Sequence, residues 1–166
     1  MADVTLFDIM SAATTRIGDL PEAGNGHLTI EFPEPQRITK SPTTLVVGGA
    51  VPIPNTIGQK FDRQQWRGGI TIRTLVDING RAPQERAVLY RLLPKFIDLF
   101  DPITNGGGSV GRILHTLPGP IRSFLYQGYT FGAFEYDAST RCYALDIYYQ
   151  AEWDRQAQVI PIGGAP

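Results

Sequence analysis

Cysteine and histidine are both scarce in this sequence. Cys142 is the one cysteine among 166 residues, which excludes an intrachain disulfide and a metal cluster held by several thiolates. The two histidines, His27 and His115, lack the HxH or HxxxH spacing that is typical of a metal site. We therefore predict neither a metal nor any other cofactor, and we interpret Cys142 as a small buried hydrophobic residue.

Charged residues are also few, and neither sign dominates. They make up 19% of the chain, against about 25% in typical soluble domains, and 15 basic residues nearly balance 16 acidic ones. No basic run is longer than a pair, so the chain lacks the basic stripe that nucleic-acid binders present to phosphates. Folding could still gather Arg63, Arg67, Arg73 and Arg81 into a local patch.

Long hydrophobic runs are absent as well. No apolar run approaches the ~20 residues that span a bilayer. The N-terminal segment has neither a basic region nor an unbroken apolar core, so it is not a signal peptide. We expect a soluble chain that is made in a cytoplasm and has no membrane partner.

Glycine and proline, by contrast, are abundant, with 18 and 13 residues against a usual combined share of about 12%. They concentrate in long connections without clear periodicity. Because loops over about 12–15 residues inside a compact domain are commonly functional, we predict that residues 53–66 and 104–112 are interface loops. The simpler alternative for each is a surface loop without a partner. The candidate contact residues are Ile53, Pro54, Asn55, Phe61, Arg63, Trp66, Asn105, Gly106, Gly107, Gly108 and Arg112.

Two segments have helical periodicity. Residues 5–18 place apolar side chains on one face, with Thr5 and Asp8 spaced as a capping box and Gly18 as a stop signal. A second helix begins near Pro83 and ends at Phe100. Pro94 lies inside it, so we expect a kink there or a division into two helices.

The remaining patterns predict strands, at residues 27–32, 43–51, 69–78, 111–117, 121–128, 129–137 and 141–153. The clearest is 69–78, where Ile70, Ile72, Thr74, Val76 and Ile78 alternate with more polar residues. In 141–153 the odd positions from Tyr143 to Trp153 form the apolar face. Turn chemistry at 79–80, 127–128 and 138–140 separates neighbouring strands.

These elements predict one α+β domain. A mainly antiparallel β-sheet packs against an N-terminal helix and a central helix, with long Gly/Pro-rich loops between the elements. We place the domain at residues 1–156 and expect residues 157–166 to form an extended C-terminal tail.

No motif points to catalysis. "GGGSVG" contains G-x-G-x-x-G, but it follows a helix and precedes a strand, the reverse of the order in a dinucleotide site, and no P-loop lysine accompanies it. There is no G-x-S-x-G elbow, and the carboxylates are scattered. We expect Asp146 to be solvent-exposed on the polar face of its strand. The tyrosines, with Phe131 and Phe134, could form a base-stacking platform, but we interpret them as sheet core. We predict that the protein is not an enzyme.

The order of these segments resembles the tail terminator, or tail-completion, proteins of long-tailed bacteriophages. The likeness covers residues 5–153 and lies in layout and hydrophobic spacing. A helix "LFDIMSAATTRI", a short "PTTLVV" strand and a loop ending at Trp66 precede "GITIRTLVDI" and the helix "APQERAVLYRLLPKFIDLF". After a glycine-rich linker, "YQGYTFG" and "YALDIYY" match the family's aromatic–glycine pattern and its following alternating strand.

The resemblance implies a homohexameric ring that does no covalent chemistry. Such a ring caps the head-proximal end of the tail tube in the virion, stops tube polymerisation and joins the tail to the neck or head. Its partners would be other copies of itself, the tail tube protein and a neck or head-completion protein, with DNA passing through the lumen. Assembly would take place in the host cytoplasm.

Three alternatives remain open. The first is a neck or head–tail connector protein, or a tail tube-like protein, within the same class of assembly. The second is a small-ligand-binding domain or an enzyme with an unrecognised site. The third is a nucleic-acid binder, whose affinity would fall steeply with salt.

Overall fold

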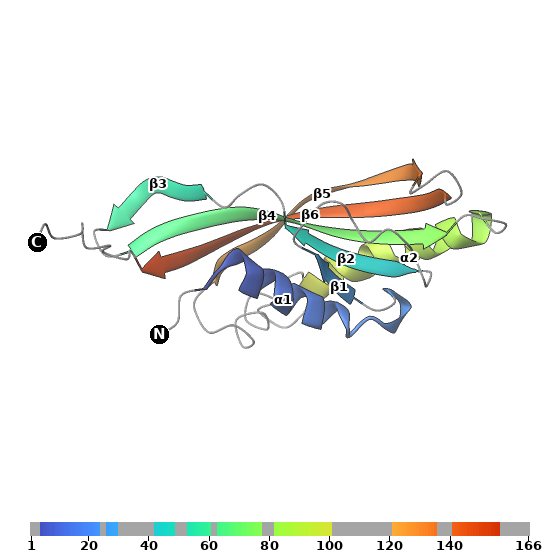
Figure 1. Cartoon of the computed structure of the whole chain (residues 1–166), viewed down its shortest axis with the longest axis horizontal. Helices are drawn as coiled ribbons and strands as arrows, with labels where there is room; N and C mark the ends of the chain where they lie inside the picture. The colour runs from blue at the N-terminus through green and yellow to red at the C-terminus, as the bar shows by residue number, and fades with distance from the viewer. Residues whose placement is uncertain are drawn as a thin grey trace, which may run out of the picture.

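The protein is an α+β domain built on one six-stranded sheet (Figure 1). The structure, a computed structural model, describes residues 4–23, 26–29, 42–48, 53–60, 63–77, 82–100, 121–135 and 141–156. The elements in chain order are α1 (Leu6–Ile17), a 3₁₀ turn η1 (Pro21–Ala23), β1 (Gly26–Thr29), β2 (Thr43–Gly48), β3 (Ile53–Lys60), β4 (Arg63–Asp77), α2 (Ala82–Phe100), β5 (Ile121–Glu135) and β6 (Arg141–Gln156). The predicted fold class, a mainly antiparallel sheet with an N-terminal and a central helix, is confirmed.

The sheet is organised around its two long central strands. Its order is β1-β2-β4-β6-β5, and only the β1–β2 pair is parallel. β4 and β6 pair along their whole length, from Arg63 opposite Gln156 to Asp77 opposite Cys142. Because β6 occupies one entire edge of β4, β2 and β3 lie end to end along its other edge. Figure 1 shows β3 and the adjoining ends of β4 and β6 extending past α1 at one end of the molecule.

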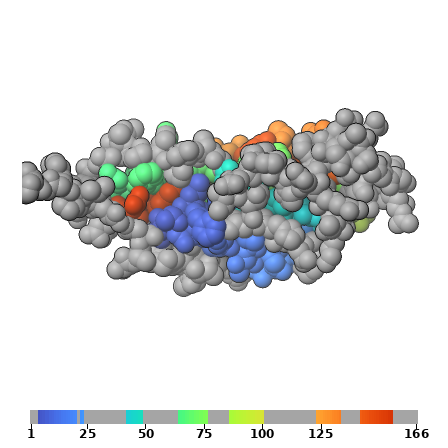
Figure 2. All heavy atoms as spheres, in the orientation of Figure 1, coloured from blue at the N-terminus to red at the C-terminus, as the bar shows by residue number. Residues whose placement is uncertain are grey.

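Both helices pack on the same face of the sheet. Even-numbered residues of β4, such as Ile70 and Ile72, and odd-numbered residues of β6, such as Leu145 and Ile147, belong to the main core together with side chains from α1 and α2. This alternation confirms the sequence prediction for both strands over the described residues, and Ile78 lies outside them. Figure 2 shows α1 lying along one side of the molecule.

The predicted caps of α1 are confirmed. The Asp8 backbone N–H donates to the Thr5 hydroxyl, and the Asp8 carboxylate accepts from the Thr5 backbone N–H at 2.8 Å, which is the reciprocal capping box. The helix ends at Ile17, with Gly18 as its C-cap. Because Asp8 satisfies a backbone donor that begins the helix, the helix start is set by local sequence.

A buried hydroxyl chain ties the turn after α1 to the sheet. Thr44 and Thr74 lie opposite each other in β2 and β4, and both are fully buried. The Thr44 hydroxyl donates to the Ala23 carbonyl at 2.7 Å, so its contact with Thr74, at 3.0 Å, has Thr74 as the donor. On the surface, an ion pair from Lys95 lowers the pKa of Glu22, chiefly through its hydrogen bond, and links η1 to α2.

Helix α2 is a single element, so of the two outcomes predicted at Pro94 the division into two helices is wrong, and the kink stays a prediction. Pro94 lies on the exposed side of the helix, while Leu92 and Phe96 on either side of it are buried in the core. Packing therefore holds both halves of the helix on the sheet. The Tyr90 carbonyl loses its helical donor to the proline, and Tyr90 is itself an exposed residue.

Strand β5 runs straight through the predicted turn at residues 127–128, so that prediction is also wrong. Residues 121–135 form one strand antiparallel to β6, with an irregularity between Tyr126 and Gly128. Gly128 has φ 141°, a conformation that favours glycine, and it accommodates the extra residue of a β-bulge. The pairing of Glu135 with Arg141 joins β5 and β6. The predicted turn at 138–140 lies outside the described residues, as do 30–32, 78–80, 111–117 and 157–166.

Candidate assembly surface

Part of the first predicted interface loop is a strand pair. Ile53, Pro54 and Asn55 belong to β3, and they lie opposite Arg67, Trp66 and Gln65 of β4. β4 itself begins at Arg63, six residues before the predicted start of the strand at residue 69. The prediction of a loop over 53–66 is therefore wrong for all but residues 61–62, which lie outside the described part. Backbone pairing with β4 organises a segment that has no hydrophobic alternation of its own.

The second predicted interface loop lies outside the described residues. This applies to Asn105, Gly106, Gly107, Gly108 and Arg112, and to Phe61 from the first loop. Their role in contacts stays a prediction. The structure thus brings together only Ile53, Pro54, Asn55, Arg63 and Trp66 of the predicted set, within β3 and the start of β4.

Trp66 is held by contacts within its own chain. It is half-buried against the main core and lies opposite the buried Trp153 in the β4–β6 register. Its indole N–H donates to the Gln64 side chain at 3.3 Å, and the Arg155 guanidinium lies 5.6 Å from its ring centroid. The main role of Trp66 is therefore to stabilise the fold, and only part of its side chain remains exposed for a partner.

The clearest exposed surface is the outer edge of β5. Among the described strands, β5 pairs with β6 alone and ends the sheet. Residues 123–134 contain no charged side chain. An edge strand presents a row of backbone N–H and C=O groups that another strand can pair with. The β5 edge is therefore the candidate assembly surface.

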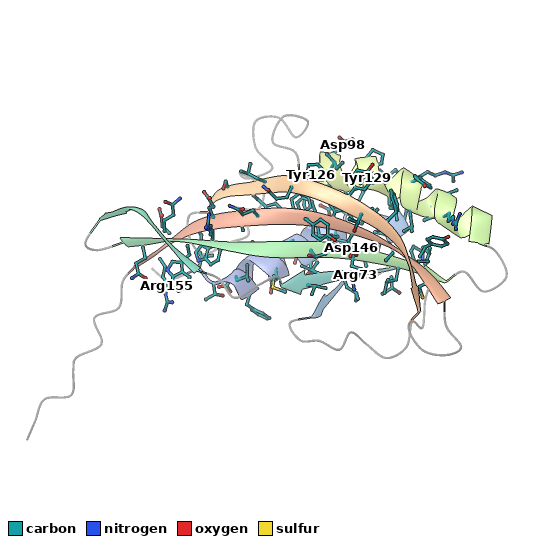
Figure 3. The ribbon with its side chains drawn as sticks, turned by 90° about the horizontal axis from the view of Figure 1, so that it is seen from above. Arg73, Asp98, Tyr126, Tyr129, Asp146 and Arg155 are labelled. Atoms are coloured by element: carbon teal, nitrogen blue, oxygen red, sulfur yellow. The ribbon has the colours of Figure 1, made fainter. Side chains whose placement is uncertain are left out.

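Large hydrophobic and aromatic side chains flank this edge on both faces of the sheet. On the helix face, Tyr126 is 41% exposed, Tyr129 47% and Tyr90 of α2 63%. Figure 3 shows Tyr126 and Tyr129 on the α2 side of β5. On the other face lie Leu125, 50% exposed, and Tyr148 of β6. We call these five residues, together with the outer backbone edge of β5, the β5 edge surface.

Ring contacts hold the helix-face part of this surface in place. The Tyr90 and Phe131 ring centroids lie 4.7 Å apart, and those of Tyr129 and Phe131 lie 5.4 Å apart in an edge-to-face arrangement. Tyr126 meets the buried Tyr149 ring at 6.1 Å. The exposed tyrosines are thus supported by half-buried or buried rings, which reduces the entropy that they would lose on binding.

Sequence reasoning missed this surface. The tyrosines were interpreted as sheet core, which holds for Tyr149 and fails for Tyr126, Tyr129 and Tyr148. The bulge at 127–128 brings residues 126 and 129 to the same face, opposite Tyr149 and Ile147 respectively. The charge-free run 123–134 was visible in the sequence, but only the strand order shows that it lies at an edge.

The face of the sheet opposite the helices carries a buried ion pair. Arg73 and Asp146 lie opposite each other in β4 and β6, and their side chains point toward one another (Figure 3). The Arg73 Nε donates to Asp146 Oδ1 at 2.7 Å and Nη2 donates to Oδ2 at 2.8 Å. Asp146 is only 8% exposed, so the prediction of a solvent-exposed carboxylate is wrong. Arg73 therefore binds a carboxylate of its own chain.

A second, smaller core lies on this same face. It contains Leu45, Val47, Leu75, Cys142 and Ala144. Cys142 is fully buried in this core, which confirms its interpretation as a small buried hydrophobic residue. Within the described residues, no three His, Cys, Asp or Glu side chains gather where they could hold a metal ion. None of the helices in the described part of the chain is long and apolar enough to cross a membrane.

No model of a known protein family matches this chain, and no curated protein matches it either.

Proposed function

We propose that this chain is a structural subunit of a bacteriophage tail. Copies of it form a ring that caps the head-proximal end of the tail tube, stops tube polymerisation and joins the tail to the neck. The proposal starts from the resemblance in the order of the segments. A mainly antiparallel sheet with one N-terminal and one central helix agrees with that layout.

The observation that supports an assembly role is the β5 edge surface. A 15-residue edge strand without charge over residues 123–134 is a liability for a protein that stays alone, because it invites pairing with other strands. Exposed tyrosines beside an edge are typical of surfaces that become buried between proteins. A subunit whose working state is an assembly would carry such a surface.

The ring would have a defined set of neighbours. Six copies would meet through heterologous contacts, since a closed ring joins two different surfaces of each subunit. The tail tube protein would bind one side of the ring and a neck or head-completion protein the other, with DNA passing through the lumen. The protein would act in the virion after assembly in the host cytoplasm.

Electron microscopy of labelled tails tests this function. Native mass spectrometry and negative-stain images would be recorded for the purified protein alone and mixed with tails of the same phage that lack a terminator. We expect label at one tail end only, as a six-fold ring. Tails that already carry their terminator are the control and should take up no further label.

The same experiment separates the alternatives within the tail. A tube-like protein would extend the tube beyond one ring, and a neck connector would bind only to tails that already carry a terminator. A protein that never labels a tail end would contradict the proposal. Thermal shifts with a panel of metabolites would then test for a ligand, because binding to the native state raises its melting temperature.

A further inference from the structure

We infer that two copies of the free protein pair antiparallel through their β5 edges, about a local twofold axis near Gly128. This inference goes beyond the proposed function, because it concerns the protein before it meets a tail. It makes the β5 edge surface a contact between two copies of this chain. A twofold contact cannot by itself close a ring of six, so the free dimer and the ring would be distinct states.

The two other edge strands of the described sheet, β1 and β3, are less suited to pairing. β1 has only four residues. β3 contains Pro54, which has no backbone N–H, and its register with β4 shifts between Asn55 and Lys60. β5 has 15 residues and, despite its bulges, contains neither a proline nor a charge between residues 123 and 134. Short strands, prolines and charges are the usual protection of an edge, and the segment 123–134 of this long strand has neither a proline nor a charge.

The side chains around β5 favour a strand as its partner. Tyr126, Tyr129 and Tyr90 stand on one face and Leu125 and Tyr148 on the other, so a strand added at this edge would pack against side chains above and below it. Backbone hydrogen bonds would then supply affinity along the edge. The uncharged segment offers no cation for a phosphate backbone, which argues against a nucleic acid as the partner.

The charges at the two ends of β5 favour a second copy of this chain as the source of the partner strand. Arg122 precedes the uncharged segment 123–134 and Glu135 follows it. If the uncharged segments of two antiparallel copies overlap fully, Arg122 of one copy comes to the register position of Glu135 of the other, at both ends of the contact. The segment is therefore complementary to itself, with no like charges opposed.

The area of the β5 edge surface indicates how strongly two copies should bind each other. Tyrosine and phenylalanine side chains bury about 150–250 Å² each, so the exposed fractions of Tyr90, Tyr126 and Tyr129 amount to roughly 300 Å² per copy. A stable interface buries about 800 Å² per partner. Even with the added strand edge, we expect a weak dimer whose population depends on concentration.

A charge swap at the ends of β5 tests the pairing. Sedimentation equilibrium of the full chain should show a monomer–dimer equilibrium. Arg122→Glu should weaken the dimer about tenfold, because it opposes two acidic residues at each end. The double variant Arg122→Glu/Glu135→Arg restores opposite charges and should restore the dimer. Rescue of this kind requires β5 to meet β5.

A second pair of variants tests the tyrosines. Tyr129 and Phe7 are each 47% exposed, and Phe7 lies on α1. Tyr129→Lys should leave the protein monomeric, whereas Phe7→Lys should dimerise as the wild type does. Thermal unfolding of each variant shows whether it is folded before its association is measured.

The inference is overturned if the wild type stays monomeric at the highest soluble concentration, if it forms six-fold rings on its own, or if the double charge variant fails to restore pairing. Rings in free solution would contradict this inference while supporting the proposed function. A charge-dependent dimer that never labels a tail end would support this inference and contradict the proposed function.

Discussion

The pair of Arg73 and Asp146 shows how much a single residue's role depends on its cross-strand neighbour. Both residues occupy positions that the alternation pattern assigns to the polar face of their strands, and that assignment is right. The register of β4 and β6 then sets the guanidinium directly against the carboxylate. The result is a bidentate pair with side-chain exposures of 19% and 11%, in which two charge-assisted hydrogen bonds join the guanidinium to the carboxylate.

We therefore expect Asp146→Asn to destabilise the fold by about 2 kcal/mol, because it removes the negative charge that accepts two hydrogen bonds from the mostly buried Arg73. Urea unfolding followed by tryptophan fluorescence measures this change. Arg67→Lys, at an exposed position of the same strand, is the control and should change the unfolding free energy by less than about 0.5 kcal/mol. If Asp146→Asn lowers the unfolding free energy by no more than the control does, the ion pair contributes little to stability.

At the scale of elements, the bulge in β5 decides which side chains the edge presents. Side chains of a regular strand alternate between faces, so residues 126 and 129 would point to opposite sides. The extra residue at 127–128 resets the alternation and places both tyrosines on the helix face. Gly128 makes this possible because its φ of 141° is strained for any residue with a Cβ.

Gly128→Ala should therefore destabilise the protein by about 1 kcal/mol or more. Gly132→Ala in the same strand is a matched control. No atom lies within 4 Å of an added Cβ at either position, and of the two only Gly128 has a positive φ. We expect the control to be neutral or slightly stabilising in thermal unfolding. Equal effects at the two positions would show that the bulge conformation carries no cost.

At the scale of the whole molecule, the sheet joins the helices into one unit. β6 pairs with β4 up to Gln156, and no described pairing extends past it. The main core draws on both helices and on β2, β4, β5 and β6. Such a core should unfold as one cooperative unit.

A chain that ends at Gln156 should therefore keep the fold. We expect calorimetry to show one unfolding transition for both the full chain and residues 1–156, with midpoints within about 4 °C, the shift expected for 1 kcal/mol at this size. A chain ending at Tyr148, which removes the part of β6 opposite residues 63–70, is the contrasting variant and should lose most of its stability. Two transitions in the full chain, or a large loss on removing residues 157–166, would contradict the single-domain boundary.

Local sequence was sufficient to predict the elements whose stabilising groups lie close together along the chain. The Thr5 capping box, the end of α1 before Gly18 and the alternating faces of β4 and β6 were all predictable. Their causes are hydrogen bonds within one helical turn and a two-residue period of hydrophobic side chains.

The remaining features depended on groups that are distant in sequence. β3 forms because β4 supplies its backbone partners, α2 stays whole across Pro94 because the core holds both halves, and Asp146 is buried because Arg73 lies opposite it. The charge-free run in β5 could be read from the sequence, but its position at a sheet edge could not. The sequence by itself thus determined which segments form helices and amphipathic strands, since propensity and periodicity are local. Tertiary structure alone decided which strand ends the sheet and which side chains reach its edge, because strand order and register are set by long-range pairing and packing.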